Sequence, residues 1–207
     1  MKRSFVRTVV VFAVVGLANL TSAQRTAQAL PITFEGLSDL DGVTNQFAGM
    51  GVVFSNATAL IDGSVGGSLN EIDFPPRSGV TVVIDDGGAM MLVFTTPFTA
   101  VSGFFTYNTQ LILQAFSDSA GTNLIGSVTS AFADNTGTGG NQGSSPNEIL
   151  ALSGIGLIRS IKITGDPGGS SFVLDDFNGA PIPEPASLLL LGSGLGGAWL
   201  ARRRKRR

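Results

Sequence analysis

The chain contains no cysteine and no histidine, and each absence excludes a group of functions. Without cysteine there is no disulfide framework, no thiolate nucleophile and no cysteine-ligated zinc site. Without histidine there is no Ser-His-Asp triad, no histidine-ligated zinc and no histidine general base. A folded domain of this chain must therefore be held together by burial of apolar side chains.

Aromatic side chains that carry a polar atom are also scarce. The chain has one tryptophan, Trp199, and one tyrosine, Tyr107, beside fourteen phenylalanines. Lectin-like sites usually present tryptophan or tyrosine to the apolar face of a sugar, so a carbohydrate site has few candidates here. The best is the segment 107–110 (Tyr-Asn-Thr-Gln), with an ordinary turn as the alternative. Phenylalanines at strand positions are expected in the core, among them Phe34, Phe54, Phe94 and Phe116.

Positive charge is rare in the middle of the chain. Residues 30–182 hold three basic residues against fourteen acidic ones, a net charge of −11, whereas residues 1–29 carry +4 and residues 183–207 carry +5. An acidic segment repels the phosphates of nucleic acids, so a nucleic-acid partner is not expected.

The N-terminal residues 1–29 have the pattern of a secretory signal peptide. Basic residues at positions 2, 3 and 7 precede an apolar stretch over residues 9–20, which is too short for a comfortable membrane span. Ala27 and Ala29 supply the small side chains that a signal peptidase reads, which places cleavage before Leu30. The alternatives are cleavage after the small residues 21–23 and an uncleaved anchor.

The last 25 residues have a different order of features. The tripeptide Pro183-Glu184-Pro185 precedes an uncharged, apolar run over residues 186–201, and six basic residues over 202–207 end the sequence. Sixteen helical residues span about 24 Å at ~1.5 Å per residue, which is short of a hydrocarbon core of about 30 Å. The run therefore predicts a marginal single transmembrane helix whose basic end lies in the cytoplasm.

This C-terminal segment resembles the PEP-CTERM sorting signal of Gram-negative bacteria. The resemblance covers roughly an eighth of the chain and rests on the tripeptide, the glycine-interrupted apolar run and the terminal arginines. It implies that exosortase, an integral-membrane cysteine peptidase, recognises Pro183, Glu184 and Pro185 and releases or transfers the protein outward. The partners so implied are exosortase, the secretion machinery and, transiently, the inner membrane. A plain membrane anchor is the alternative.

The middle of the chain predicts an all-β domain over residues 30–180. Short apolar segments alternate with Gly, Asn, Asp, Ser and Pro clusters, and no helical periodicity is sustained between the two terminal segments. This pattern favours an antiparallel β-sandwich or jelly roll. The predicted strands are 32–36, 46–54, 58–61, 80–84, 90–94, 101–106, 111–116, 123–129, 149–152, 158–164 and 171–176.

The two ends of this domain resemble the jelly-roll domains of secreted carbohydrate-binding modules. The resemblance rests on an opening Ile-Thr-Phe-Glu-Gly segment and a closing Phe-Val-Leu-Asp-Asp-Phe segment. It implies that the first and last strands lie side by side and share a structural calcium. Glu35, Asp175 and Asp176 would supply hard oxygen ligands, and the alternative is that these acids face solvent or cap strand ends. No other cofactor is expected.

Two further segments have a structural and a functional interpretation. Asp85-Asp86-Gly87-Gly88 predicts a hairpin turn. Because neighbours on a strand point to opposite faces, a glycosidase-type carboxylate pair would need a partner for these acids from elsewhere in the fold. Residues 135–147 contain no apolar side chain apart from glycine and proline, which favours a mobile loop over a binding loop.

Three functions remain. The leading interpretation is an exported, non-enzymatic protein of the cell surface or extracellular matrix, sorted by exosortase and in contact with extracellular polysaccharide. The second is a secreted carbohydrate-binding module. The third is a carboxylate-dependent glycoside hydrolase.

Overall fold

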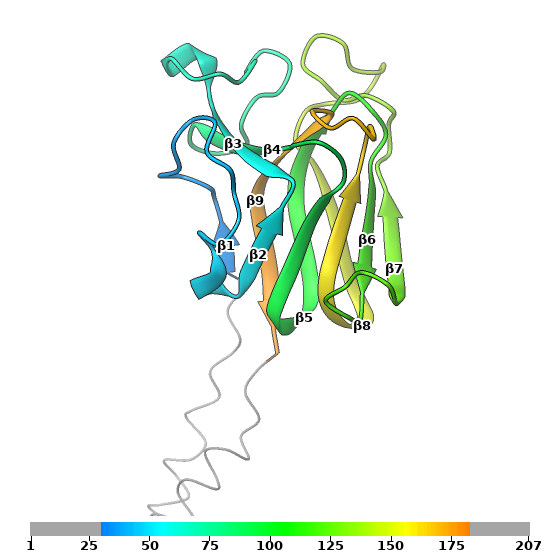
Figure 1. Cartoon of the computed structure of the whole chain (residues 1–207). Helices are drawn as coiled ribbons and strands as arrows, with labels where there is room; N and C mark the ends of the chain where they lie inside the picture. The colour runs from blue at the N-terminus through cyan, green and yellow to red at the C-terminus, as the bar shows by residue number, and fades with distance from the viewer. Residues whose placement is uncertain (1–29, 183–207) are drawn as a thin grey trace, which may run out of the picture. The chain divides into compact units, whose positions relative to one another are not determined.

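A computed structural model describes residues 30–182, which form one compact unit (Figure 1). Within this part of the chain the regular structure is nine β-strands and two short 3-10 turns, so the predicted all-β class is confirmed. The strands are β1 (Leu30–Ile32), β2 (Val52–Ser55), β3 (Ala57–Ile61), β4 (Thr81–Asp85), β5 (Met90–Tyr107), β6 (Ile112–Phe116), β7 (Leu124–Thr129), β8 (Glu148–Thr164) and β9 (Phe172–Pro181). The turns are η1 (Ala48–Met50) and η2 (Gly63–Val65).

All strands belong to one antiparallel sheet. Its order is β3-β4-β9-β5-β8-β6-β7, and β1 pairs with β9 while β2 pairs with β5. The last strand in the sequence, β9, therefore lies inside the sheet between β4 and β5.

The sheet folds back on itself because β5 and β8 both bend. The register between these strands shifts between Val93 and Phe98 and again before Ala100. Opposite this point β8 has extra residues, and two of them, Gly154 and Gly156, have φ of 69° and 107°. These values favour glycine, since a side chain is strained there. The bend therefore lets β5 and β8 contribute to both halves of the folded sheet, which face each other in Figure 1.

These bends correct the predicted strand list. Residues 90–94 and 101–106 are parts of the single strand β5, and residues 149–152 and 158–164 are parts of β8. The connecting residues contain Pro97, Gly154 and Gly156, which are typical of turns. In the structure they bend a strand without ending it.

One apolar cluster fills the space between the two halves of the sheet. Leu92 and Ile161 come from one half and Phe105 and Leu150 from the other, and each is at most 2% exposed. The four phenylalanines predicted to be core residues are at most 4% exposed, so that prediction is confirmed. Lys162 lies between Ile161 and Ile163 as the alternation indicates, because both isoleucines are 0% exposed and the lysine is half-buried.

The described chain begins and ends at the same end of the sheet. β1 runs antiparallel to β9, with Leu30 opposite Gly179 and Ile32 opposite Phe177. Figure 1 shows the start of β1 and the end of β9 at this end. The first and last strands are thus neighbours, as the resemblance to jelly-roll modules implied.

Candidate functional site

The three acids predicted as calcium ligands all contact the segment 77–81, which leads into β4. Glu35 Oε1 accepts hydrogen bonds from the backbone N–H groups of Val80 and Thr81, both at 3.0 Å. The carboxylate therefore fixes the start of β4 next to the residues that follow β1.

Asp175 and Asp176 hold the other end of the same segment. Asp175 Oδ2 accepts from the N–H groups of Arg77 at 2.7 Å and Ser78 at 2.9 Å. The Ser78 hydroxyl donates to Asp176 Oδ1 at 2.8 Å. Asp176 has φ of 47° and lies where the register between β9 and β5 shifts, so its side chain and that of Asp175 reach the same segment.

Asp175 is buried at 1% exposure, and burial raises its pKa to about 6. The hydrogen bonds from Ser78, Asp176 and Arg77 oppose this rise in pKa, and the nearby Asp176 carboxylate adds to it. Burial therefore dominates over the backbone donors at this carboxyl group.

These contacts differ from those of a calcium site. Among residues 30–182, no group of three or more acidic side chains is placed so that it could hold a metal ion. One oxygen each of Glu35, Asp175 and Asp176 accepts from N–H or O–H donors of the segment 77–81. These carboxylates tie loops to strands, and calcium binding by them stays a prediction.

The segment held in this way places Arg77 over Phe104. The guanidinium carbon lies 4.9 Å from the centre of the Phe104 ring, a distance at which the cation is attracted to the ring face. Phe104 pairs with Asp175 on β9 and with Ile149 on β8, and the Ile149 side chain is 57% exposed. No local pattern predicts this pair, because Arg77 and Phe104 lie 27 positions apart on elements that meet only in the folded sheet.

Asp85 does not form the predicted hairpin turn. β4 and β5 are separated by β9, so residues 85–88 connect two strands that do not pair. The Asp85 carboxylate instead accepts from the N–H groups of Ser171 at 2.8 Å and Phe172 at 3.0 Å, and from the Ser171 hydroxyl. Asp85 is 0% exposed, and burial raises its pKa despite these donors. The acid therefore joins the end of β4 to the start of β9.

Tyr107 is a core residue and presents no ring to a ligand. It is 0% exposed, its hydroxyl donates to Glu148, and burial raises its pKa to about 12. Glu148 also accepts from the N–H of Ala131 at 3.0 Å. The predicted sugar-binding patch at 107–110 is therefore wrong for Tyr107, because this ring is buried. Its hydroxyl finds its hydrogen-bond partner inside the domain, at the end of a long inner strand.

The polar loop 135–147 is anchored by a buried side chain. Asn135 is 0% exposed and accepts from the Tyr107 N–H at 2.7 Å, while its amide donates to the carbonyls of Phe105 at 3.0 Å and Ser145 at 3.1 Å. The hydroxyl of Thr138, in the same loop, donates to Asp73 of the neighbouring loop. Because this loop has no apolar side chains apart from glycine and proline, hydrogen bonds hold its conformation.

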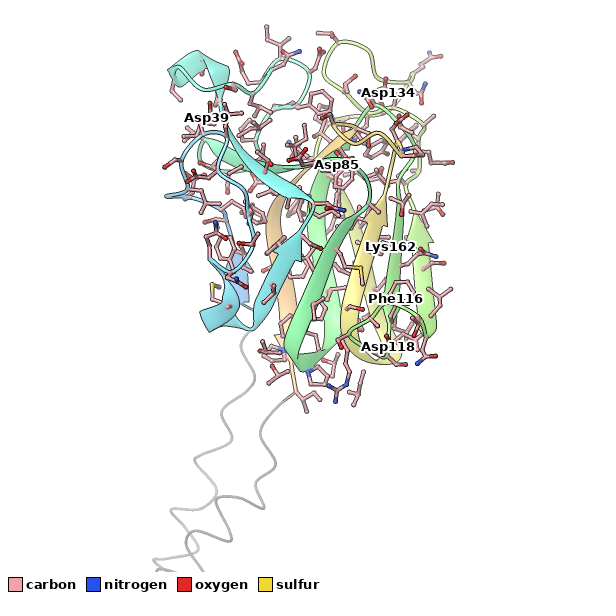
Figure 2. All side chains as sticks on the ribbon, viewed as in Figure 1. Asp39, Asp85, Phe116, Asp118, Asp134 and Lys162 are labelled. Atoms are coloured by element: carbon pink, nitrogen blue, oxygen red, sulfur yellow. The ribbon has the colours of Figure 1, made fainter. Side chains whose placement is uncertain are left out.

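A second loop lies over the outer face of the sheet at the other end of the molecule. Asp118 accepts from the N–H groups of Ala120, Thr122 and Asn123, and these donors lower its pKa. Figure 2 shows Asp118 near Phe116 and Lys162, and the lysine Nζ lies 5.8 Å from the Phe116 ring centre.

The predicted sorting and cleavage residues lie outside the described residues. These are Pro183, Glu184 and Pro185 at one end of the chain and Ala27 and Ala29 at the other. The same holds for the predicted span 186–201. Across residues 30–182, no helix has the length and apolar character needed to cross a membrane.

Comparison with known proteins identifies one motif. Residues 181–206 match the PEP-CTERM protein-sorting motif, which indicates an exported protein that is sorted by exosortase. No curated protein matches the sequence.

Two adhesin domains are among the solved structures that match the chain. One is the K2 cleaved adhesin domain of Lys-gingipain, with 12% identity, a TM-score of 0.46, and coverage of 73% of this chain and 99% of that one. The other is the K1 cleaved adhesin domain of Lys-gingipain from Porphyromonas gingivalis W83, with 9% identity, a TM-score of 0.38, and coverage of 75% and 99%. Both TM-scores are too low to support a functional argument.

Proposed function

We propose that the chain is a non-enzymatic protein of the cell surface or extracellular matrix of a Gram-negative bacterium, delivered there by removal of both its ends. In this proposal residues 1–29 are a signal peptide cleaved after Ala29, and residues 186–201 cross the inner membrane until exosortase acts at Pro183-Glu184-Pro185. The folded part, of the jelly-roll sandwich kind, is the product that reaches the surface.

The observation that carries this proposal is the position of the sorting motif. The match begins at residue 181, where β9 ends, so no further folded segment separates the β-domain from the signal. The charge distribution supports the same order, since the acidic stretch 30–182 lies between two basic ends.

Intact mass of the exported protein tests the proposal directly. We expect a product that begins at Leu30 and lacks Trp199 and the basic residues 202–207. A surface form that keeps residues 186–207 would contradict sorting and would leave a simple anchor.

A substitution variant tests recognition at the tripeptide. Replacing Pro183-Glu184-Pro185 by three alanines should trap the precursor in the inner membrane, whereas Gln142→Ala, at an exposed position of the β-domain, should leave delivery unchanged. Equal delivery of both variants would refute recognition at the tripeptide.

For retention in extracellular polysaccharide, the supporting observation is the Arg77–Phe104 pair. It lies on the outer face of the sheet beside the exposed Ile149, and it joins a cation to an aromatic ring. We expect Arg77→Ala to weaken binding of the exported protein to acidic polysaccharide several-fold, while Arg159→Ala, at another exposed arginine, leaves it unchanged. Equal binding of the two variants would exclude this pair as a polysaccharide site.

A further inference from the structure

The end of the β-domain from which the chain leaves toward the sorting motif differs in charge from the rest of the domain. We call it the tether end. It consists of the segments 46–52, 94–100, 117–124, 153–159 and 178–182, which contain the bends of β5 and β8, the start of β7 and the end of β9.

Of the fourteen acidic residues in 30–182, only Asp118 lies in these segments, and Arg159 balances it. The remaining acids give the other parts of the domain their strong negative charge. Figure 2 shows Asp39, Asp85 and Asp134 toward the opposite end of the sheet from Asp118. The tether end is thus the one end without a net charge of its own.

The tether end also exposes apolar side chains. Leu124 is 52% exposed, Leu157 is 50% exposed and Ile182 is 39% exposed. The bend of β5 adds Thr95, Thr96 and Thr99, which are exposed and uncharged. Apolar and hydroxyl side chains without acids suit the headgroup region of a lipid bilayer better than an acidic surface does.

The length of the connecting chain sets how far this end can lie from the membrane. Four peptide steps separate Ile182 from Ala186, the first residue of the apolar run, and four extended residues reach at most about 14 Å. The headgroup layer on each side of the hydrocarbon core takes up about 5–8 Å of that length. An acidic end placed this close to anionic lipids would be repelled, because the distance is similar to the Debye length of about 8 Å.

The short connecting chain, the lack of net charge and the exposed apolar side chains all concern the tether end. From them we infer that the tether end is a lipid-contacting surface. The precursor rests on this surface against the anionic membrane before its tail is removed. The inference depends on the proposed function, since it requires residues 186–201 to be in the bilayer. The opposite end, with loops 62–80 and 130–147, then faces away from the membrane.

The absence of cysteine allows a direct test on the full chain. Thr96→Cys places a single thiol at the tether end, and Gln142→Cys places one on an exposed loop at the opposite end. Each thiol carries a fluorophore, and the full-length protein is reconstituted in phosphatidylethanolamine and phosphatidylglycerol vesicles that contain headgroup-spin-labelled lipid. Resistance of the protein to alkaline extraction reports insertion of the tail independently of the fluorescence.

We expect several-fold stronger quenching at position 96 than at position 142. In the Thr96→Cys chain, Leu157→Asp should reduce quenching, whereas Ile72→Asp, at a residue that is 66% exposed on the loop 62–80, should not. Equal quenching at the two positions in extraction-resistant protein overturns the inference and leaves the proposed function intact.

Three other results are also decisive. If Leu157→Asp leaves the quenching at position 96 unchanged, the inferred lipid contact is refuted. The nearness of this end to the membrane is then explained by the short connecting chain alone. Quenching that requires co-reconstituted exosortase assigns the surface to a protein partner and overturns the lipid assignment. Extraction of the full chain at alkaline pH refutes the proposed function and this inference with it.

Discussion

In this chain without cysteine, Asp85 and Asp175 each join segments that lie far apart in the sequence. Each is at most 1% exposed, and each accepts hydrogen bonds from backbone N–H groups of a segment that is more than 80 positions away in sequence. A carboxylate with several N–H donors can be buried because the donors offset part of its lost hydration. Burial nevertheless has a larger effect on the pKa than the donors have, since the pKa of both groups is raised.

The raised pKa of Asp175 predicts how stability depends on pH. Its pKa is about 6 in the folded chain and 3.8 as the ordinary value, so the folded state binds the proton more tightly. The contribution to stability is full below pH 4 and is lost as pH rises through 6, on the order of 3 kcal/mol. Urea denaturation should therefore give a higher free energy of unfolding at pH 5 than at pH 7.5.

Asp175→Asn removes the titrating group and should flatten this dependence. Asp118→Asn is the control, because the pKa of Asp118 is lowered and its contribution is lost only at more acidic pH. A slope between pH 5 and 7.5 that is as steep in Asp175→Asn as in the unchanged chain would contradict the assignment, since Asp85, whose pKa is also raised, can account for only a remaining part of it.

Asn135 is an uncharged side chain that, like Asp85 and Asp175, joins distant segments, and its removal should lower the free energy of unfolding. Asn135→Ala deletes three hydrogen bonds and leaves the Tyr107 N–H and the Phe105 carbonyl buried without that partner. We expect a loss of about 2–4 kcal/mol in the free energy of unfolding, measured in urea. Gln142→Ala, at an exposed position in the same loop, should change it by less than about 0.5 kcal/mol. Similar values for the two variants would show that the loop is not anchored by Asn135.

Among the elements, β5 and β8 matter most, because their bends build both halves of the sheet. Sequence reasoning placed a predicted strand at all or part of every observed strand, although at β1 it covered only Ile32. It failed at the bends, since Pro97 and the glycines at 154 and 156 have the same local signature in a bent strand as in a turn. It also failed for Asp85 and Tyr107, whose roles depend on strand order and burial. Local sequence carries alternation, whereas strand order depends on contacts between distant residues.

At the bend in β8, a substitution of glycine should lower stability through backbone strain alone, without loss of a side-chain contact. Gly156 has φ of 107°, and no atom lies within 4 Å of the place that a methyl group would take, so Gly156→Ala adds strain and no clash. We expect a loss of about 1–2 kcal/mol in the free energy of unfolding. Gly42→Ala is the control, because that position is also open and lacks a positive φ. A neutral Gly156→Ala variant would show that the bend tolerates other conformations.

At the scale of the folded domain, residues 30–182 combine strong negative charge with few cations to offset it. Residues 30–182 contain only Arg77, Arg159 and Lys162 as basic residues, so few ion pairs can be lost when salt is added. Screening of the repulsion among fourteen acids is then the larger effect. We expect the thermal midpoint of the exported protein to rise by several degrees when sodium chloride increases from low to physiological concentration, measured by circular dichroism. A fall in the midpoint would contradict this balance of charges.

The position of β9 constrains the order of events during export. This strand is the last in the sequence and yet lies between β4 and β5, with β1 also paired to it. The interior of the sheet therefore has a gap until residues 172–181 have joined it. Translocation of the β-domain must be nearly finished before folding can be completed. In the proposed export route, folding is therefore completed only as the adjacent sorting motif reaches the membrane, and tail removal then acts on a protein whose last strand is in place.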